Sequence, residues 1–306
     1  MEFVVNWLAA TPGHATPLLL AALGLIINER AGVLNLGSEG MMLCGAFAGA
    51  AAALATGSPW PGLAAAMAGG AALAAIFAVA VVVFRTEQVV TGLIMVALGA
   101  GLTGLLGRDL TNQTLPGLRR LDLGPLSEIP VIGPILFRQD PAAYLAVALA
   151  IGLSVWLVRS RAGLRLCAVG EDPAAADALG LNVQRQRMLA VIAGGALCGL
   201  GGGYLALVSS QVWVEGMTQG RGWIAVGLVI FARWRPLLAL AGALLFGAIE
   251  AMIPRVQAVG AAVPVYLMTM LPYLATLAVL VLAALRRRRD DEPAALGQPY
   301  LRQDRH

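Results

Sequence analysis

Polar side chains interrupt stretches of the sequence that are otherwise strongly apolar, and they are the residues that could do chemistry. An ionisable group inside a membrane span is costly unless it is solvated or paired, so such a residue usually has a role. Amides, hydroxyls and a few carboxylates can hydrogen-bond a neutral, hydroxyl-rich solute on its way through a membrane. The predicted solute-contacting residues are Asn35, Glu39, Glu87, Gln88, Thr91, Gln211, Glu215 and Arg221.

The acidic members of this set also have a structural interpretation. Glu39 stands at the start of an apolar run, where its carboxylate would complement the dipole of a helix N-terminus or pair with Arg30. Glu39 and Glu215 could instead accept hydrogen bonds from the hydroxyls of a solute. The sequence leaves both interpretations open.

Few residues are of the types that carry catalysis or bind metals. The two histidines, His14 and His306, lie near the ends, and the three cysteines, Cys44, Cys167 and Cys198, are typical of small buried residues. A phosphate-binding loop of the glycine-rich type needs a lysine, and all 21 basic residues are arginine. The sequence therefore predicts no enzyme, no metal site and no cofactor in this chain, and the net charge of +4 does not indicate a nucleic-acid partner.

The elements that must position these residues are membrane helices. Of the 306 residues 59% are hydrophobic and only 12% are charged, whereas a soluble domain carries about 25% charged residues. The mean hydropathy is +0.79. A soluble globule could not bury so much apolar surface, so we expect an all-α integral membrane protein.

Runs of the length that crosses a bilayer predict a polytopic bundle of about nine spans, with eight to ten as the range. The first and seventh runs are short, which indicates broken or half-spanning helices of the kind that border transport paths. The predicted spans are 15–28, 37–56, 62–84, 89–107, 142–158, 188–209, 222–232, 236–253 and 265–285.

Arginine placement predicts the orientation of the bundle. Arginines crowd the loop 159–187 and follow the last span at 286–289, so both segments and the C-terminus are expected in the cytoplasm. Residues 1–285 then form the transmembrane domain. The tail 286–306 is polar and is expected to be disordered, with its arginines touching membrane lipid.

A short helix is punctuated clearly inside the loop 159–187. Asp172 is a suitable N-cap, Pro173 fits the first helical position, and Gly180 supplies a left-handed exit. A helix this short is unstable alone in water, so it must pack against the bundle or a partner. A plain connecting helix and a docking helix for a cytosolic partner both fit this pattern.

Four motifs occur in order along the chain: ERAGVLNLGSEGMMLCGAF, TEQVVTG, GLRLCAVGEDPAAADALGLNV and GRGWIAVGLVIFARWRP. Together they resemble the permease subunits of ABC importers, in the simple-sugar and nucleoside branch related to branched-chain amino acid permeases. The chain resembles the shorter permease of a purine nucleoside importer. The resemblance implies import of a nucleoside, a purine nucleoside first, or of a simple sugar across a bacterial inner membrane.

The resemblance also implies partners and a coupling surface. The expected partners are an ABC ATPase subunit that binds ATP and Mg, a second and longer permease that completes a heterodimer, and an extracytoplasmic substrate-binding lipoprotein. The third motif resembles the family's coupling loop, which contacts the ATPase. The implied coupling residues are Gly170, Glu171, Asp172, Pro173, Ala175, Ala176, Asp177, Leu179 and Gly180.

One alternative remains from the residues themselves. A stand-alone secondary transporter or channel for a small polar solute could use the acids within the spans for proton coupling. It would need no ATPase, so solute movement by the purified chain alone would favour it.

Overall fold

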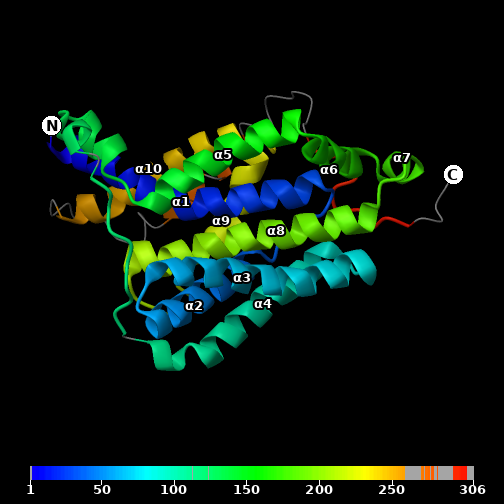
Figure 1. Cartoon of the computed structure of the whole chain (residues 1–306), viewed down its shortest axis with the longest axis horizontal. Helices are drawn as coiled ribbons and strands as arrows, with labels where there is room; N and C mark the ends of the chain where they lie inside the picture. The colour runs from blue at the N-terminus through cyan, green and yellow to red at the C-terminus, as the bar shows by residue number, and fades with distance from the viewer. Residues whose placement is uncertain are drawn as a thin grey trace.

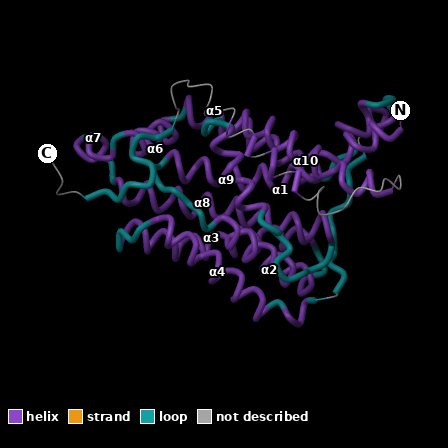
Figure 2. Tube along the Cα trace, turned by 180° about the vertical axis from the view of Figure 1, so that it is seen from behind, coloured by secondary structure: helices purple, strands orange, loops and turns teal. Residues whose placement is uncertain are grey.

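Long helices lie side by side along one axis of the molecule (Figure 1). The computed structural model describes residues 2–111, 113–122, 124–258, 270–271, 273–275, 277–278, 281 and 292–301. Within these residues the structure is helical apart from loops and two isolated β-bridges. Figure 2 shows helices throughout, with the longest loops toward the two ends.

Seven helices of the described part are long and apolar enough to cross a membrane. The α3 and α8 helices are extended by π-helical turns at 79–83 and 205–210. The long helices are α1 (Glu2–Arg30), α2 (Ser38–Thr56), α3 (Pro59–Ala78), α4 (Gln88–Leu106), α5 (Pro141–Arg159), α8 (Val183–Tyr204) and α10 (Pro236–Ala258). The short helices are α6 (Arg161–Glu171), α7 (Pro173–Ala178) and α9 (Arg221–Phe231).

The architecture confirms an all-α polytopic membrane protein, consistent with about nine spans. The seventh predicted span is α9, whose 11 residues rise only about 16 Å, half of a bilayer core. The ninth predicted span, 265–285, lies mostly outside the described residues, although 270–271, 273–275 and 277–278 are helical.

The first helix is longer than the sequence predicts. The run 15–28 was expected to be short, yet α1 has 29 residues and continues through Pro12 and Pro17. The hydroxyls of Thr11 and Thr16 donate to the carbonyls of Trp7 and Pro12, one turn earlier, at 3.1 and 2.8 Å, and most of α1 from Thr11 to Glu29 is buried against its neighbours. Packing against neighbouring helices therefore overrides the helix-breaking tendency of proline here.

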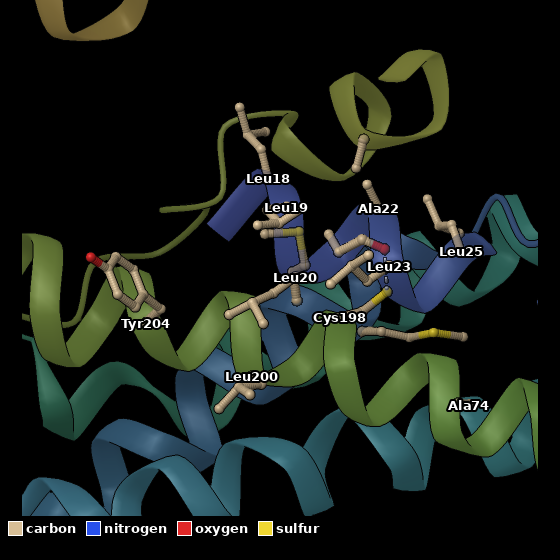
Figure 3. Packing of buried hydrophobic residues seen from close by; sticks show 14 of the residues in the cluster. Leu18, Leu19, Leu20, Ala22, Leu23, Leu25, Ala74, Cys198, Leu200 and Tyr204 are labelled. Atoms are coloured by element: carbon tan, nitrogen blue, oxygen red, sulfur yellow. Dashed lines mark hydrogen bonds between the residues drawn. The ribbon is translucent and has the colours of Figure 1, made fainter. Parts of the chain in front are cut away.

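The centre of the bundle is the α8 helix, which packs against α1, α2 and α3. Close approach depends on paired glycines: a Cβ atom at Gly24 would collide with the backbone of Gly194, and one at Gly45 with the backbone of Gly199. Leucines of α1 fill the space beside these contacts, and Figure 3 shows them above Cys198 and Leu200 of α8.

The two ends of the bundle differ in character. One end, called the loop end below, carries residues 107–140, where the chain forms short helical turns and extended segments. The opposite end carries α6, α7 and the C-terminal residues 292–301, and it is called the α7 end (Figure 1).

Candidate functional site

The short helix at the α7 end is built as the sequence predicts. The Asp172 side chain caps α7 by accepting a hydrogen bond from the Ala175 N–H at 2.9 Å, and Pro173 takes the first helical position. Gly180 has φ +84°, the left-handed conformation that ends the helix. The predicted punctuation of this helix is therefore confirmed.

One face of α7 is buried and the other is open. Ala176 is 2% exposed and packs with Val169 of α6 and Val183 of α8. Ala175 is exposed, and Leu179 is an apolar side chain with 83% of its surface exposed. The open face of α7 therefore presents the small side chain of Ala175 and the apolar side chain of Leu179.

Residues 292–301 pack onto this end of the bundle. The Ala295 N–H donates to the Gly170 carbonyl at 2.9 Å, and the buried Arg187 guanidinium donates to the Gln298 carbonyl at 2.9 Å. The Tyr300 side chain packs against the cluster that contains Ala176.

The expectation of disorder in the tail does not hold for residues 292–301, because polar backbone groups and an apolar ring find partners on α6, α7 and α8. The other parts of the tail, 286–291 and 302–306, lie outside the described residues.

A second group of polar residues lies in the middle of the bundle, where α9 begins. The Glu39 carboxylate accepts hydrogen bonds from the Thr218 hydroxyl at 2.5 Å and from the backbone N–H groups of Gly220 and Gly222 at 2.8 and 2.6 Å. The next residue, Gly40, packs against the middle of α4. A carboxylate is thus held against the positive end of a half-length helix deep in the bundle.

The structure decides between the structural interpretations of Glu39. Pairing with Arg30 is wrong, because the Arg30 guanidinium donates to the Trp234 carbonyl at 3.3 Å. The dipole interpretation is confirmed, and Glu39 serves two helices: it lies in the first turn of α2 and binds the N-terminus of α9.

An ion-pair chain continues from the start of α9. The Arg221 guanidinium lies 3.1 Å from the Glu250 carboxylate of α10. Glu250 also lies 3.6 Å from His14 Nδ1 of α1. Three helices therefore contribute charged or titratable groups beside the Glu39 site, in a part of the bundle where an isolated charge would be costly.

Four of the predicted solute-contacting residues use their polar groups on this chain's own structure. Asn35 Oδ1 accepts from the Gly37 N–H at 2.9 Å, and Gln88 Oε1 accepts from the Leu34 N–H at 2.7 Å. Glu87 caps α4 by accepting from two backbone N–H groups, and the Thr91 hydroxyl donates to the Glu87 carbonyl at 2.6 Å. These four residues shape the turns before α2 and α4.

The remaining predicted residues border the irregular segment 211–220. Gln211 ends the π-helical turn of α8 in a left-handed conformation, and Glu215 is exposed beside Gly104 of α4. The segment starts at the loop end, where the Leu115 N–H donates to the Gln211 carbonyl at 2.8 Å, and it ends at α9. It is non-helical backbone beside α4 and α9, and inside a bilayer such backbone is tolerated only beside protein or a watery cavity.

Glu39 and Arg221 were both predicted as residues of this site, but the contact between Glu39 and the start of α9 was not. Glu39 and its N–H donors are separated by 181 and 183 positions, so no local pattern links them. The contribution of His14 was also missed, since a lone histidine near the N-terminus carries no signal. Glu250, an acid inside an apolar run, was visible as an anomaly without a partner.

Comparison with known proteins places this arrangement in a family. The family model described as branched-chain amino acid transport system / permease component matches residues 8–284. The chain belongs to this permease family. The match covers the α6 and α7 helices and the Glu39 site, so these features of the permease lie within the family's common region.

Three relatives share long stretches with this permease. A Haloferax volcanii permease protein whose name assigns it provisionally to glucose ABC transport is 41% identical over 99% of both chains. The guanosine ABC transporter permease protein of Bacillus subtilis is 36% identical over 96% of this chain and 95% of its own. The nucleoside ABC transporter permease protein of Lactococcus lactis is 34% identical over 88% of this chain and 89% of its own.

Proposed function

We propose that this permease is the membrane subunit of an ABC importer that carries a nucleoside, with purine nucleosides as the first candidates. Two of the three relatives are named for guanosine or nucleosides. The observation that carries the proposal is the capped helix α7, held on the bundle by one face and open on the other. A mobile, exposed loop would transmit force poorly, whereas a packed helix can move as one body with the spans behind it.

The proposal assigns the α7 end to the cytoplasm, where an ATPase subunit that binds ATP and Mg docks. The bonding of the α7 region supports this role, because Arg187 also donates to the Ala31 carbonyl at 3.2 Å and so ties α8 to the end of α1. The proposed contact residues are Glu171, Asp172, Pro173, Ala175, Asp177, Leu179 and Gly180, whereas Gly170 and Ala176 are buried and position the helix.

The loop end then faces the extracytoplasmic side, where a substrate-binding lipoprotein delivers the solute. The path is proposed to follow segment 211–220 down to α9, past Gln211, Glu215, Arg221 and Glu39. The second, longer permease is proposed to cover α4, which exposes apolar side chains along its length beside this segment. These exposed residues of α4 are Val89, Val90, Leu93, Ile94, Leu98, Leu102, Leu105 and Leu106.

A glucose importer is the second candidate, favoured by the 41% identical relative. The two candidates share the same chemistry, because ribose and glucose both present hydroxyls to the polar groups of the path.

Uptake by the reconstituted complex tests the proposal. The permease, its partner permease, the ATPase subunit and the binding protein are placed in liposomes with internal ATP, and uptake of labelled guanosine is measured against unlabelled adenosine, uridine, glucose and leucine. Guanosine uptake that adenosine inhibits and leucine does not is the expected result. In parallel assays with labelled glucose and labelled leucine, uptake of glucose but not of guanosine would move the substrate to the second candidate, and uptake of leucine alone would contradict both.

A further inference from the structure

A polar cavity of about 330 Å³ lies at the loop end, between α1 and the end of α8. With the exception of Gln211, none of its polar residues was predicted to contact solute. Polar side chains from four segments line it: His14, Arg120, Gln139, Asp140, Tyr204 and Gln211.

The wall of this cavity is fixed by hydrogen bonds. The Tyr204 hydroxyl donates to Asp140 Oδ2 at 2.6 Å, and Asp140 Oδ1 accepts from the Ala143 N–H at 2.9 Å. The Gln139 amide donates to the Ala9 carbonyl at 3.0 Å. Figure 3 shows the Tyr204 ring at the edge of the leucine packing with its hydroxyl directed away from it. These internal hydrogen bonds fix the positions of Gln139, Asp140 and Tyr204 in the wall.

The mixture of groups indicates the class of ligand. Arg120 and Asp140 carry opposite charges, and the other polar lining groups can donate and accept hydrogen bonds. Such a wall suits a neutral solute with several hydroxyls better than it suits an ion of either sign. The volume falls at the lower end of small-molecule sites, which measure about 300–1,000 Å³.

The cavity is linked to the deep site by side chains. His14, on its wall, lies 3.6 Å from Glu250, and Glu250 lies 3.1 Å from Arg221 at the start of α9. The N-terminus of α9 in turn holds Glu39. Polar groups thus continue from the cavity to the middle of the bundle, within a single subunit.

We propose that this cavity is a loading site for a neutral, polyhydroxylated solute, which occupies it before it passes along α9. The inference rests on the proposed function, since it needs the loop end to face the side from which solute is delivered. It assigns to this subunit a binding site of its own, in addition to any path shared with the second permease.

Filling the cavity from α1 tests the inference. A Cβ atom on Gly13 would meet only the Tyr204 hydroxyl, at 3.8 Å, so a larger side chain enters the cavity without displacing backbone. Uptake of guanosine and of glucose is measured for the reconstituted complex with Gly13→Ala and Gly13→Leu. Because one surplus methylene in a closed site changes selection by about tenfold or more, Gly13→Leu should lower guanosine uptake about tenfold and that of the smaller glucose by less.

Gly152→Leu is the matched control, because Gly152 lies in α5 with open space around it. Both variants also replace glycine by a better helix former, so helix propensity cannot explain a loss. Normal uptake of the transported solute by Gly13→Leu would overturn the loading site, and so would an equal loss of guanosine and glucose uptake where the wild-type complex takes up both. A wild-type complex that takes up neither solute would overturn the proposed function, and the loading site with it.

Discussion

Ala175→Arg should reduce uptake by the reconstituted complex by about 30-fold or more. Ala175 lies on the exposed face of α7, one turn from the exposed Leu179. If the ATPase covers this position, docking must remove the new arginine charge from water. Changes at the centre of an interface cost about 2–4 kcal/mol of binding free energy. The loss should therefore come from failed docking of the ATPase, measured as ATPase subunit retained on the purified permease.

Two comparisons separate docking from folding in this prediction. Ala176→Arg is expected to damage the fold as well, since Ala176 is 2% exposed against Val169 and Val183. Ala162→Arg makes the same change on an exposed position of α6 and should leave most of the uptake. Full uptake and full ATPase retention by Ala175→Arg would remove α7 from the coupling surface.

Glu39→Gln should lower both the thermal stability of the purified permease and its uptake. The carboxylate accepts three hydrogen bonds in a buried position, and hydrogen bonds to charged groups contribute about 1.5–3 kcal/mol each. The amide nitrogen of a glutamine would face the N–H group of either Gly220 or Gly222, so at least one of these hydrogen bonds is lost. The start of α9 should then move, as a fall in melting temperature would report.

Glu87→Gln is the control, because Glu87 also caps a helix but does so at an exposed position. It should cost less than about 1 kcal/mol, the usual value for a cap. If Glu39→Gln kept the melting temperature and raised only the KM for uptake, Glu39 would be a solute contact and its structural role would be secondary.

The α7 helix and the long helices could be predicted because their signals lie between neighbouring residues of the chain. The cap, proline and glycine of α7 act within nine residues, and apolar runs predict long helices because the bilayer thickness fixes their length. The short seventh run predicted the half-length α9 for the same reason. These features depend on neighbours in the chain, which a sequence displays directly.

The α6 helix offered a local signal that was overlooked, since Gly163, Leu166, Val169 and Gly170 recur at helical spacing on its buried face.

Other features could not be predicted from the sequence because they depend on distant contacts. The order of residues 292–301 gave no such signal, because their partners on α6 and α8 lie more than 100 positions earlier. A polar segment looks disordered until the groups that satisfy its backbone are known.

Cross-linking from α7 shows whether this helix contacts the ATPase subunit in the assembled complex. Ala175→Cys is made in a Cys167→Ser background, because Cys44 and Cys198 are buried and Cys167 is only partly so. Burial raises the pKa of the Cys167 thiol, which slows its labelling, but replacing it removes the competition altogether. A photoreactive maleimide attached to the new thiol is then activated in the assembled complex.

We expect an adduct between this permease and the ATPase subunit. The same label on Gln113→Cys, at the loop end, should give no such adduct. A label on α7 that never reaches the ATPase, or a label at the loop end that does, would contradict the assignment of α7 as the helix through which ATP hydrolysis drives transport.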